Sequence, residues 1–373
     1  MKTLLRLDLN VPIKNGTIKD TSKINSYTKS IKNLVKNNQL AVFSHIGRPK
    51  NNEQELSSKN LIPTLEKIWQ VKVRFIADYS SEKITKALNT LDSNEIILLE
   101  NTRFFDWEKS NDHSQAKQIA SNFDQYILDA FASSHRCHLS TDAISDYLPS
   151  KLGDTCKQEV DNLTQAIHLQ NPTIIMGGAK AQTKLMIIER FLEDSKEILV
   201  GGILANTFLK AQGFNIQKSI YEESLVKHCQ TILQSKNSHK IILPFDFLVA
   251  ESLESTDCRH TEILKPNEII LDIGPKTTQH FTQAISKNSN IIFNGPMGYI
   301  ENPTFANGSI HTIQAICKQT NSYIGGGDSL KLMSLAKLNL KDFKFVSMGG
   351  GAMLEFIAEQ GKLKPITKIK KSQ

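Results

Sequence analysis

The chain has 373 residues, of which 39% are hydrophobic and 22% charged, with 19 glycines and 11 prolines. This composition excludes a disordered, collagen-like or low-complexity chain and is typical of a globular protein. The length predicts two domains, because single hydrophobic cores rarely grow beyond about 250 to 300 residues. Lys and Arg number 45 against 38 Asp and Glu, and the net charge of +7 favours anionic partners without identifying one.

Nucleic acid and membrane binding find no support in the sequence. Aromatic residues make up 7% of the chain, and the basic residues are dispersed rather than gathered in a stripe. No stretch reaches the roughly 18 apolar residues of a membrane helix, and Arg6 and Asp8 interrupt the start before a signal core could form. The five cysteines form no CxxC pair, which is typical of reduced thiols. We expect a cytoplasmic monomer that binds small molecules, with a solvated basic end at 362–371.

Short β-branched runs, each followed by a turn and helical spacing, repeat along the chain and predict an α/β fold with a parallel sheet in each half. In the first half, the expected strands are Leu4–Val11, Leu40–Ser44, Val71–Ile76, Ile96–Leu99 and Tyr126–Leu128, with helices at Lys23–Lys36 and Ser114–Asn122. A helical connector is expected at 151–169. In the second half, the expected strands are Thr173–Met176, Ile198–Val200, Ile241–Leu243, Ile291–Phe293, Tyr323–Ile324 and Phe343–Val346.

Cationic and imidazole side chains follow the expected strands of the first half. The first strand would carry Arg6, Asp8 and Asn10 on one face. After later strands come His45, Arg48, Arg103, His135, Arg136 and His138. The carboxyl ends of parallel strands line a ligand crevice, where a phosphate or carboxylate would offset the repulsion between these groups. Zinc is disfavoured because the histidines have no thiolate or carboxylate near them beyond Cys137.

In the second half, glycines stand where strands end and helices begin. They are Gly177, Gly178, Gly201, Gly202, Gly295, Gly325–Gly327 and Gly349–Gly351. Backbone N–H groups at such helix starts can bind phosphate, because no side chain blocks the anion. Tight turns also use glycine without any ligand, and for Gly201 and Gly202 both interpretations stay open.

Neither GxxxxGK[ST] nor GxGxxG is present, which disfavours a P-loop nucleotide site and a nicotinamide-dependent phosphosugar dehydrogenase. Instead, MGGAKAQTK places Lys180 and Lys184 one turn apart at the start of a helix, where two ammonium groups suit a triphosphate. Asp328 follows three glycines at another helix start. Its carboxylate could hold Mg²⁺ beside a phosphate, or it could serve as an N-cap that needs no metal.

These segments together resemble the phosphoglycerate kinase family. The shared segments, in the family's order from Arg6 to Phe356, are RLDLNVP, SHIGRPK, ENTRF, DAFASSHRCH, GGAKAQTK, GGILANTFLKAQG, LPFDFLVA, DIGPKT, NGPMG, FANG, GGGDS and GGGAMLEF. The resemblance implies two Rossmann-like domains with parallel sheets, joined by a helix and hinge. Residues 1–150 would bind phosphoglycerate, 151–170 would form the interdomain helix, 171–356 would bind nucleotide, and 357–373 would pack back on the first domain.

The reaction that the resemblance implies is Mg²⁺-dependent phosphoryl transfer from 1,3-bisphosphoglycerate to ADP, giving ATP and 3-phosphoglycerate in glycolysis and gluconeogenesis. Hinge closure would allow direct in-line transfer between these substrates. Lys23 and Met348 stand where the family has Arg and Thr. An alternative therefore stays open: a duplicated relative that binds nucleotide or phosphoglycerate but has little catalytic activity.

The resemblance also implies roles for individual residues. The implied catalytic residues are Lys23, Lys184, Gly350 and Gly351. The implied substrate-binding residues are Arg6, Asp8, Leu9, Asn10, Lys23, His45, Ile46, Gly47, Arg48, Arg103, His135 and Arg136. The implied nucleotide-binding residues are Lys180, Lys184, Asn294, Glu301, Gly325, Gly326, Gly327, Asp328 and Ser329, with Asp328 also holding the metal. Because Lys23 keeps the charge of an arginine but lacks its two-pronged donor geometry, we expect reduced turnover with near-normal nucleotide binding.

Overall fold

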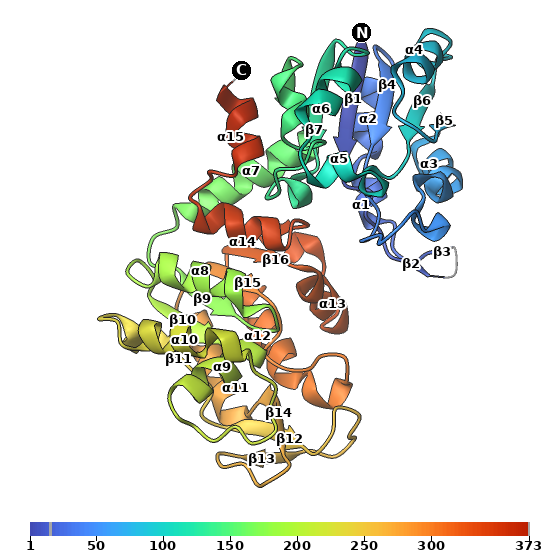
Figure 1. Cartoon of the computed structure of the whole chain (residues 1–373). Coiled ribbons are helices and arrows are strands. Elements are labelled where there is room, and N and C mark those ends of the chain that lie inside the picture. Colours follow the sequence, from blue (N-terminus) through green and yellow to red (C-terminus); the bar gives the residue numbers. More distant parts are fainter. Residues whose placement is uncertain (15–16, 372–373) are drawn as a thin grey trace. The chain divides into compact units, whose positions relative to one another are not determined.

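The computed structural model describes residues 1–14 and 17–371, which form two compact units (Figure 1). The first unit comprises Met1–Asp161 and the segment from Gly361 onward, and the second comprises Asn162–Gln360. Each is an α/β unit built on a six-stranded sheet, which confirms the predicted fold class. The division does not test which ligand each unit binds, so the predicted domain roles and boundaries stay predictions.

All strands of the first sheet are parallel, in the order β5-β6-β4-β1-β7-β8. The strands are β1 (Lys2–Leu7), β4 (Gln39–Phe43), β5 (Lys72–Ile76), β6 (Glu95–Leu99), β7 (Gln125–Asp129) and β8 (Ser150–Leu152). The helices are α1 (Ser22–Ser26), α2 (Thr28–Leu34), α3 (Ile62–Trp69), α4 (Ser81–Asn89), α5 (Asp106–Lys109), α6 (His113–Ala120), α7 (Asp154–Ile167) and α15 (Lys364–Lys371). A short antiparallel hairpin pairs β2 (Ile13–Lys14) with β3 (Thr17–Ile18).

Helices cover both faces of the first sheet because successive strand side chains point to opposite sides. Leu4 packs into one core cluster together with Ile84 of α4 and Ile119 of α6. Leu5 packs into the opposite cluster with Trp69 of α3. Strands β1, β4, β6 and β7 are buried along most of their length and read as nearly continuous apolar runs, which is why the sequence located them. The partly exposed β8 was not predicted: Lys151 and Leu152 were expected in the helical connector at 151–169, whereas α7 begins only at Asp154.

The first strand is shorter than expected: β1 ends at Leu7, so Asp8 and Asn10 lie in the loop that follows. The prediction that Arg6, Asp8 and Asn10 share one strand face was therefore wrong. The side chain of Asp8 accepts a hydrogen bond from the backbone N–H of Asn10 at 3.1 Å, a local turn that replaces the sheet ladder. Pro12, which has no N–H, also cannot continue a central strand.

The basic C-terminal stretch is not the solvated end that its charge suggested. It forms the amphipathic helix α15, with Ile366 and Ile369 fully buried. Lys368 pairs with Asp142 at 3.0 Å and with Asp146 at 2.7 Å. The apolar positions three residues apart form the buried face, and the lysines between them reach acidic partners more than 200 residues away in the sequence.

The second sheet is also parallel, in the order β11-β10-β9-β15-β16-β17. Its strands are β9 (Thr173–Met176), β10 (Glu197–Val200), β11 (Ile241–Ile242), β15 (Asn290–Asn294), β16 (Asn321–Gly325) and β17 (Phe345–Ser347). The helices are α8 (Ala181–Phe191), α9 (Gly202–Ala211), α10 (Val226–Leu233), α11 (Pro275–Ser286), α12 (Asn307–Ile316), α13 (Gly327–Leu335) and α14 (Gly351–Ala358).

One part of the second unit was not predicted. Three antiparallel strands form a separate sheet in the order β13-β12-β14, namely β12 (Phe247–Ala250), β13 (Arg259–Thr261) and β14 (Ile269–Ile273). The segment Ile241–Ala250 reads as a single apolar run, but Pro244 and Asp246 divide it between two sheets. The carboxylate of Asp246 accepts backbone bonds from Lys276 and Thr277 at the start of α11, which holds this corner.

Within residues 1–14 and 17–371, no helix combines the length and apolar character needed to cross a bilayer. All five cysteines lie in these ranges, and none is in a disulfide.

Candidate active site

Both large sheets change strand order at a point that concentrates loops. In the first unit, the chain leaves β1 toward β4 and later returns on the other side with β7. In the second unit, β10 lies on one side of β9 and β15 on the other. Ligands of open α/β sheets bind outside the carboxyl ends of the strands at such switch points. The loops after β1, β4 and β7, and those after β9 and β15, are therefore the places to look for sites.

A cavity of about 170 Å³ opens at the switch point of the first unit. Its lining residues are Asp8, Asn10, Lys23, His45, Gly47, Arg48, Arg103, Ala132, Ser133 and Arg136. Eight of these ten were predicted as substrate-binding residues, and Ala132 and Ser133 were not. The loops that follow separate strands thus converge as the parallel arrangement requires.

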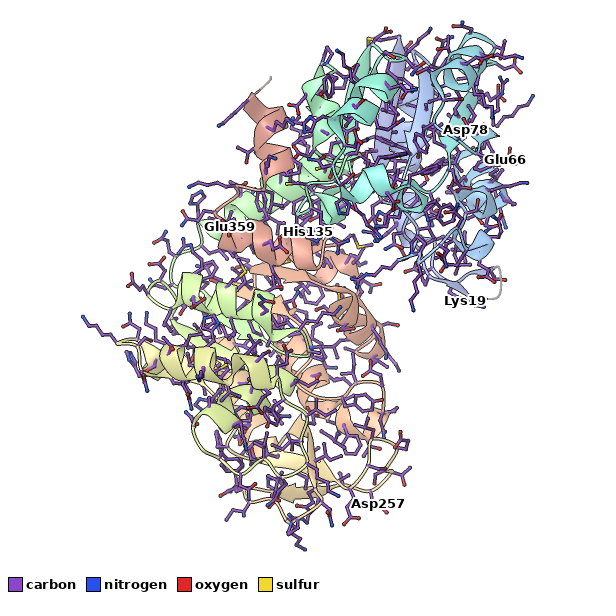
Figure 2. The ribbon with its side chains drawn as sticks, in the orientation of Figure 1. Lys19, Glu66, Asp78, His135, Asp257 and Glu359 are labelled. Carbon is purple, nitrogen blue, oxygen red and sulfur yellow. The ribbon has the colours of Figure 1, made fainter. Side chains whose placement is uncertain are left out.

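Four predicted substrate residues do not line this cavity. Leu9 and Ile46 are buried in the core, and Arg6 is 1% exposed behind the wall. His135, labelled in Figure 2, follows the short 3₁₀ helix Phe131–Ser133 and is half-buried, with its Nδ1 atom buried. Burial and the nearby Arg136 lower the pKa of His135 to about 4, so it is neutral at physiological pH.

The Arg6 guanidinium braces the wall of the cavity from inside. Its Nε donates to Ser140 Oγ at 2.8 Å, and its Nη2 donates to His45 Nδ1 at 2.9 Å. Arginine has no acceptor, so Nδ1 of His45 must carry the lone pair and Nε2 the proton. Burial and then the charge of Arg6 lower the pKa of His45 well below its usual value. His45 is therefore a neutral donor at the cavity wall.

The cationic groups around this cavity are crowded. Burial, followed by the charges of Arg136 and Arg6, lowers the pKa of Arg103 to about 10. The Arg103 Nη1 atom donates to the carbonyl oxygen of Gly47 at 2.6 Å. Crowded like charges repel one another, and an anion that binds between them offsets this repulsion. The two-pronged donors of arginine suit a phosphate or a carboxylate.

Lys23 lies on α1 and pairs with Asp8, and both residues line the cavity. Its Nζ atom is 2.7 Å from Asp8 Oδ2, and the two side chains are 27% and 6% exposed. Asn10 Oδ1 accepts the N–H of Gly47 at 2.9 Å, which ties the loop after β1 to the loop after β4. The Asp8 carboxylate and the Asn10 amide, both in the loop after β1, can bind a hydroxyl. The three arginines that line the cavity come from the loops after later strands.

A larger cavity of about 270 Å³ lies in the second unit, with mostly apolar walls. The predicted nucleotide residues Glu301 and Asp328 are among its lining residues. The lining that sequence reasoning did not assign to a site includes Ile203, Asn206, Leu271, Pro296, Met297 and Gly298. The NGPMG segment was recognised as a motif, but no local signal shows that its Pro, Met and Gly face a cavity.

Lys184 is buried beside the glycine turns at the ends of β9 and β15. A Cβ atom on Gly178 would lie 3.5 Å from its Nζ atom, and one on Gly295 would lie 3.3 Å away. Burial lowers the pKa of Lys184 to about 8, while the charges of Asp328 and Glu222 act in the opposite direction. The carboxylate of Glu222 also accepts the N–H of Ala181 at the start of α8, at 2.8 Å. Lys180, in contrast, is exposed and has a left-handed backbone with φ of 61°.

Two glycine-edged helix starts come together near Asn294. A Cβ atom on Gly326 would lie 3.0 Å from Asn294 Nδ2, and one on Gly350 would lie 3.8 Å from the Cα atom of Gly326. Gly326 precedes α13 with φ of 103°, and Gly350 precedes α14 with φ of 50°, both left-handed values that favour glycine. The backbone N–H groups at such helix starts can bind anionic oxygen atoms.

Ser329 stabilises the glycine turn between β16 and α13. Its hydroxyl donates to Gly325 O at 2.8 Å and accepts the N–H of Gly295 at 3.2 Å. The side chain of Asn294 donates to Gly325 O at 2.7 Å. The predicted residues from β15 and β16 therefore lie together, with Ser329 and Asn294 holding the strand ends in register.

Within the described ranges, no group of three or more His, Cys, Asp or Glu residues could hold a metal ion alone. Asp328 is exposed on the first turn of α13 and lines the cavity. One carboxylate fits an ion that takes its other ligands from phosphate oxygens and water, as Mg²⁺ usually does. The donor set therefore fits a magnesium ion that arrives with a nucleotide.

The two sheets, each with phosphate-suited groups at its switch point, define an α/β protein that handles phosphorylated small molecules. The sequence model described as Phosphoglycerate kinase matches residues 1–361. A phosphoglycerate kinase from Wolbachia of Drosophila simulans is 39% identical over 367 residues, covering 95% of this chain and 92% of that protein. One from Dictyoglomus turgidum is 36% identical, covering 98% and 94%.

The fold is also similar to those of solved phosphoglycerate kinase structures. The phosphoglycerate kinase structure from Coxiella burnetii has a TM-score of 0.84 at 33% identity, covering 99% of this chain and 96% of that one. That from Pyrococcus horikoshii has a TM-score of 0.86 at 26% identity, covering 100% and 97%. The chain belongs to the phosphoglycerate kinase family. Its activity is the ATP:3-phosphoglycerate phosphotransferase reaction of glycolysis, which uses ATP and ADP.

Proposed function

We propose that the first unit binds 3-phosphoglycerate or 1,3-bisphosphoglycerate in its cationic cavity. The observation that carries the proposal is the convergence of Arg48, Arg103, Arg136 and neutral His45 on one cavity that Asp8 and Asn10 also line. The arginines would bind the phosphate that is not transferred, and Asp8 and Asn10 would bind the hydroxyl of the glycerate. Arg6 would act from behind, by fixing His45.

The second unit would hold ADP or ATP. The apolar cavity that contains Leu271 and Met297 suits the flat face of a base, and Glu301 at its rim could accept a ribose hydroxyl. Lys180, Lys184 and Asn294 would bind the phosphates. The N–H groups at the starts of α13 and α14, from Gly325–Gly327 and Gly350–Gly351, would bind the phosphoryl oxygens.

Magnesium would be held by Asp328 together with phosphate oxygens and water. A bound Mg²⁺ neutralises charge on the phosphates and fixes their orientation. The chain's own part is to place one carboxylate at the first turn of α13, where the partial positive charge of the helix start also faces the anion.

The transfer would be direct and in line, with no covalent enzyme intermediate. Attacking and leaving oxygens both belong to substrates, so the protein's task is alignment and charge neutralisation. Lys184 and Lys23 would oppose the charge on the moving phosphoryl group. Because the residues proposed to bind the two substrates belong to different compact units, hinge closure would bring the two substrates in line and exclude water.

A coupled assay tests the proposal. Purified protein, supplied with 3-phosphoglycerate and Mg-ATP, should form ADP and 1,3-bisphosphoglycerate, detected through a glyceraldehyde-3-phosphate dehydrogenase coupling step. Turnover should saturate with both substrates. Measurable ADP binding with no turnover would favour the alternative, a relative that binds ligands but barely transfers phosphate. Cytoplasmic location and a monomeric state belong to the proposal and would be checked by fractionation and sedimentation.

A further inference from the structure

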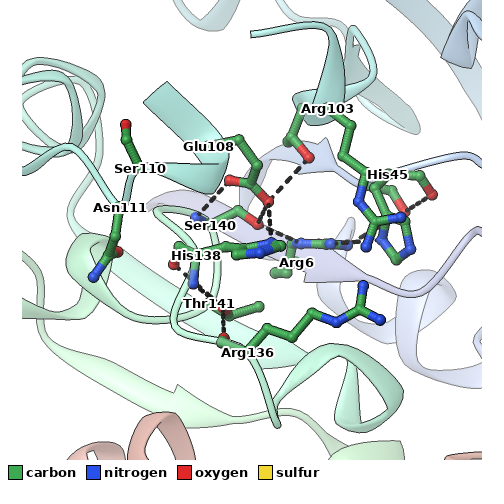
Figure 3. Close-up of polar contacts among 12 residues, drawn as sticks. Arg6, His45, Arg103, Glu108, Ser110, Asn111, Arg136, His138, Ser140 and Thr141 are labelled. Atoms are coloured by element: carbon green, nitrogen blue, oxygen red, sulfur yellow. Dashed lines mark hydrogen bonds and ion pairs between the residues drawn. The ribbon is translucent and has the colours of Figure 1, made fainter. Parts of the chain in front are cut away.

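A buried carboxylate lies behind the cationic cavity without lining it. Glu108, on α5, is 1% exposed. Its Oε1 accepts the hydroxyl of Ser140 at 2.7 Å and that of Thr102 at 3.2 Å, and its Oε2 accepts the N–H of Ser140 at 2.9 Å (Figure 3). Its own carbonyl oxygen accepts the N–H of Leu139 at 2.9 Å. Glu108 therefore fixes the loop that follows β7 at two successive residues.

The direction of these hydrogen bonds is determined by chemistry. A carboxylate only accepts, so the Ser140 hydroxyl must point its proton at Glu108. The lone pair of Ser140 Oγ is then free to accept from Arg6 Nε, which lies 2.8 Å away. Arg6 in turn donates to His45 Nδ1 at 2.9 Å. A relay thus runs from Glu108 through Ser140 and Arg6 to His45 at the cavity wall.

The charge of Glu108 also acts on its neighbours. His138 Nδ1 lies 3.7 Å from Glu108 Oε1. Burial lowers the pKa of His138, as do the charges of Arg103, Arg136 and Arg6, while Glu108 opposes them. The same carboxylate opposes the burial and arginine charges that lower the pKa of Arg103. Glu108 is therefore a counter-charge for a group of cations that would otherwise repel one another.

We propose that Glu108 is a positioning residue for the phosphorylated acid: through Ser140 it fixes the Arg6 guanidinium and the 136–140 loop, so that His45 and Arg136 meet the acid's phosphate in a fixed geometry. The inference deepens the proposed function and rests on it. The relay joins Arg6 to Ser140, which lie 134 positions apart in the sequence, and Ser140 contacts both the Glu108 carboxylate and the Arg6 guanidinium.

The first test is Glu108→Gln, which keeps the side-chain volume and removes the charge. The KM for 3-phosphoglycerate should rise about tenfold, the effect expected when a buried charge-assisted network is lost, with the KM for Mg-ATP unchanged. The matched control is Glu95→Gln. Glu95 is also buried, binds Arg74 at 2.6 Å, and lies at the amino end of β6, away from the cavity. The Glu95→Gln change should lower the melting temperature without raising the KM for 3-phosphoglycerate.

Ser140→Ala provides a gentler break in the relay and keeps the test decisive if Glu108→Gln folds poorly. Each single change should raise the KM for 3-phosphoglycerate, and the double variant should raise it no further than Glu108→Gln alone, because both act through one relay. NMR titration of His138 should show its pKa falling further in Glu108→Gln, which a purely structural loss would not produce.

The inference would be overturned by a KM for 3-phosphoglycerate that is unchanged in both Glu108→Gln and Ser140→Ala, or by one that rises equally in Glu95→Gln. Fully additive effects of the two changes would also contradict the relay. Calorimetry separates this failure from that of the proposed function. If wild-type protein binds no 3-phosphoglycerate, the proposed function is wrong; if it binds and Glu108→Gln binds equally well, only the positioning role is wrong.

Discussion

The ammonium group of Lys23 is the least expected feature of the cationic cavity. Its Nζ atom donates to Asp8 Oδ2 at 2.7 Å and to the carbonyl oxygen of Asn10 at 3.4 Å. An ammonium is a point charge, whereas a guanidinium can donate two parallel hydrogen bonds to one phosphoryl group. The position therefore keeps its charge, and we expect it to lack the two-pronged geometry that best stabilises a transferring group.

Lys23→Arg should accordingly raise kcat. Bidentate contact would add about 1 kcal/mol of transition-state stabilisation, which corresponds to about a fivefold increase. The KM for Mg-ATP should stay near its wild-type value, because Lys23 belongs to the first unit. Steady-state kinetics of both proteins measure this, and an arginine variant no faster than wild type would contradict it.

Lys184 should make activity at the proposed nucleotide site depend on pH. Its pKa of about 8 in the folded protein means that its charge is lost as the pH rises through this value. We expect kcat/KM to fall across that range, because the neutral amine cannot neutralise a phosphoryl group. The folded pKa lies below the unfolded value of 10.5, so the titration of Lys184 itself makes stability rise with pH between about 8 and 10.5 and does not contribute to unfolding there.

The pH–rate profile of Lys184→Arg is the matched measurement. A guanidinium stays protonated throughout this range. In the arginine variant, kcat/KM should therefore begin to fall only at a higher pH, whatever the absolute rate of the variant. A limb that remains at about pH 8 in the arginine variant would assign it to another group.

Among the elements, α15 shows how a charged segment can be structural. Its lysines bind Asp142, whose side chain is 1% exposed and which also accepts from Asn111 at 3.0 Å. Burial alone would raise the pKa of Asp142, but hydrogen bonds from Lys364 and Lys368 bring it below its usual value. Asp142 belongs to the loop that continues from Arg136, so α15 supports the segment that carries part of the cavity wall.

Lys368→Ala should lower the free energy of unfolding by about 1 to 2 kcal/mol, because it leaves a buried carboxylate with fewer partners. The stabilisation is present above the unfolded pKa of 3.8 and is lost as the pH falls through the lowered folded value, so the difference between variant and wild type should shrink as the pH falls below 3.8. Denaturant titrations at both ends of this range, with the exposed Lys371→Ala as the control, measure it. A loss that does not depend on pH would exclude the ion pair as the cause.

At the scale of the whole molecule, the division into two compact units separates the two proposed ligands. The cationic cavity is built entirely from Met1–Asp161, and the residues proposed to bind the nucleotide all lie in Asn162–Gln360. A substitution among the residues that bind one substrate should therefore leave binding of the other substrate unaffected in binary complexes.

Asp328→Ala tests this separation and the metal together. Titration calorimetry should show Mg-nucleotide affinity reduced about tenfold or more, because a carboxylate ligand is removed, with 3-phosphoglycerate affinity unchanged. Nucleotide binding without magnesium should change much less. Equal loss for both ligands would contradict the metal role and point to a general defect in folding.

The sequence determined the α/β class, most strand positions, and the residue types that gather at the strand ends. It could do so because buried parallel strands read as apolar runs, and because the carboxyl ends of such strands necessarily share one edge. Local spacing was also enough to place Lys184 and Asp328 at the starts of α8 and α13.

Only the tertiary structure decided that β1 stops at Leu7, that the basic C-terminal stretch folds onto Asp142, and that Glu108 stands behind Arg6. These features depend on partners far apart in the sequence, such as Arg6 and Ser140. The free energy of such contacts comes from burial and from satisfied hydrogen bonds, neither of which leaves a periodic pattern in the chain.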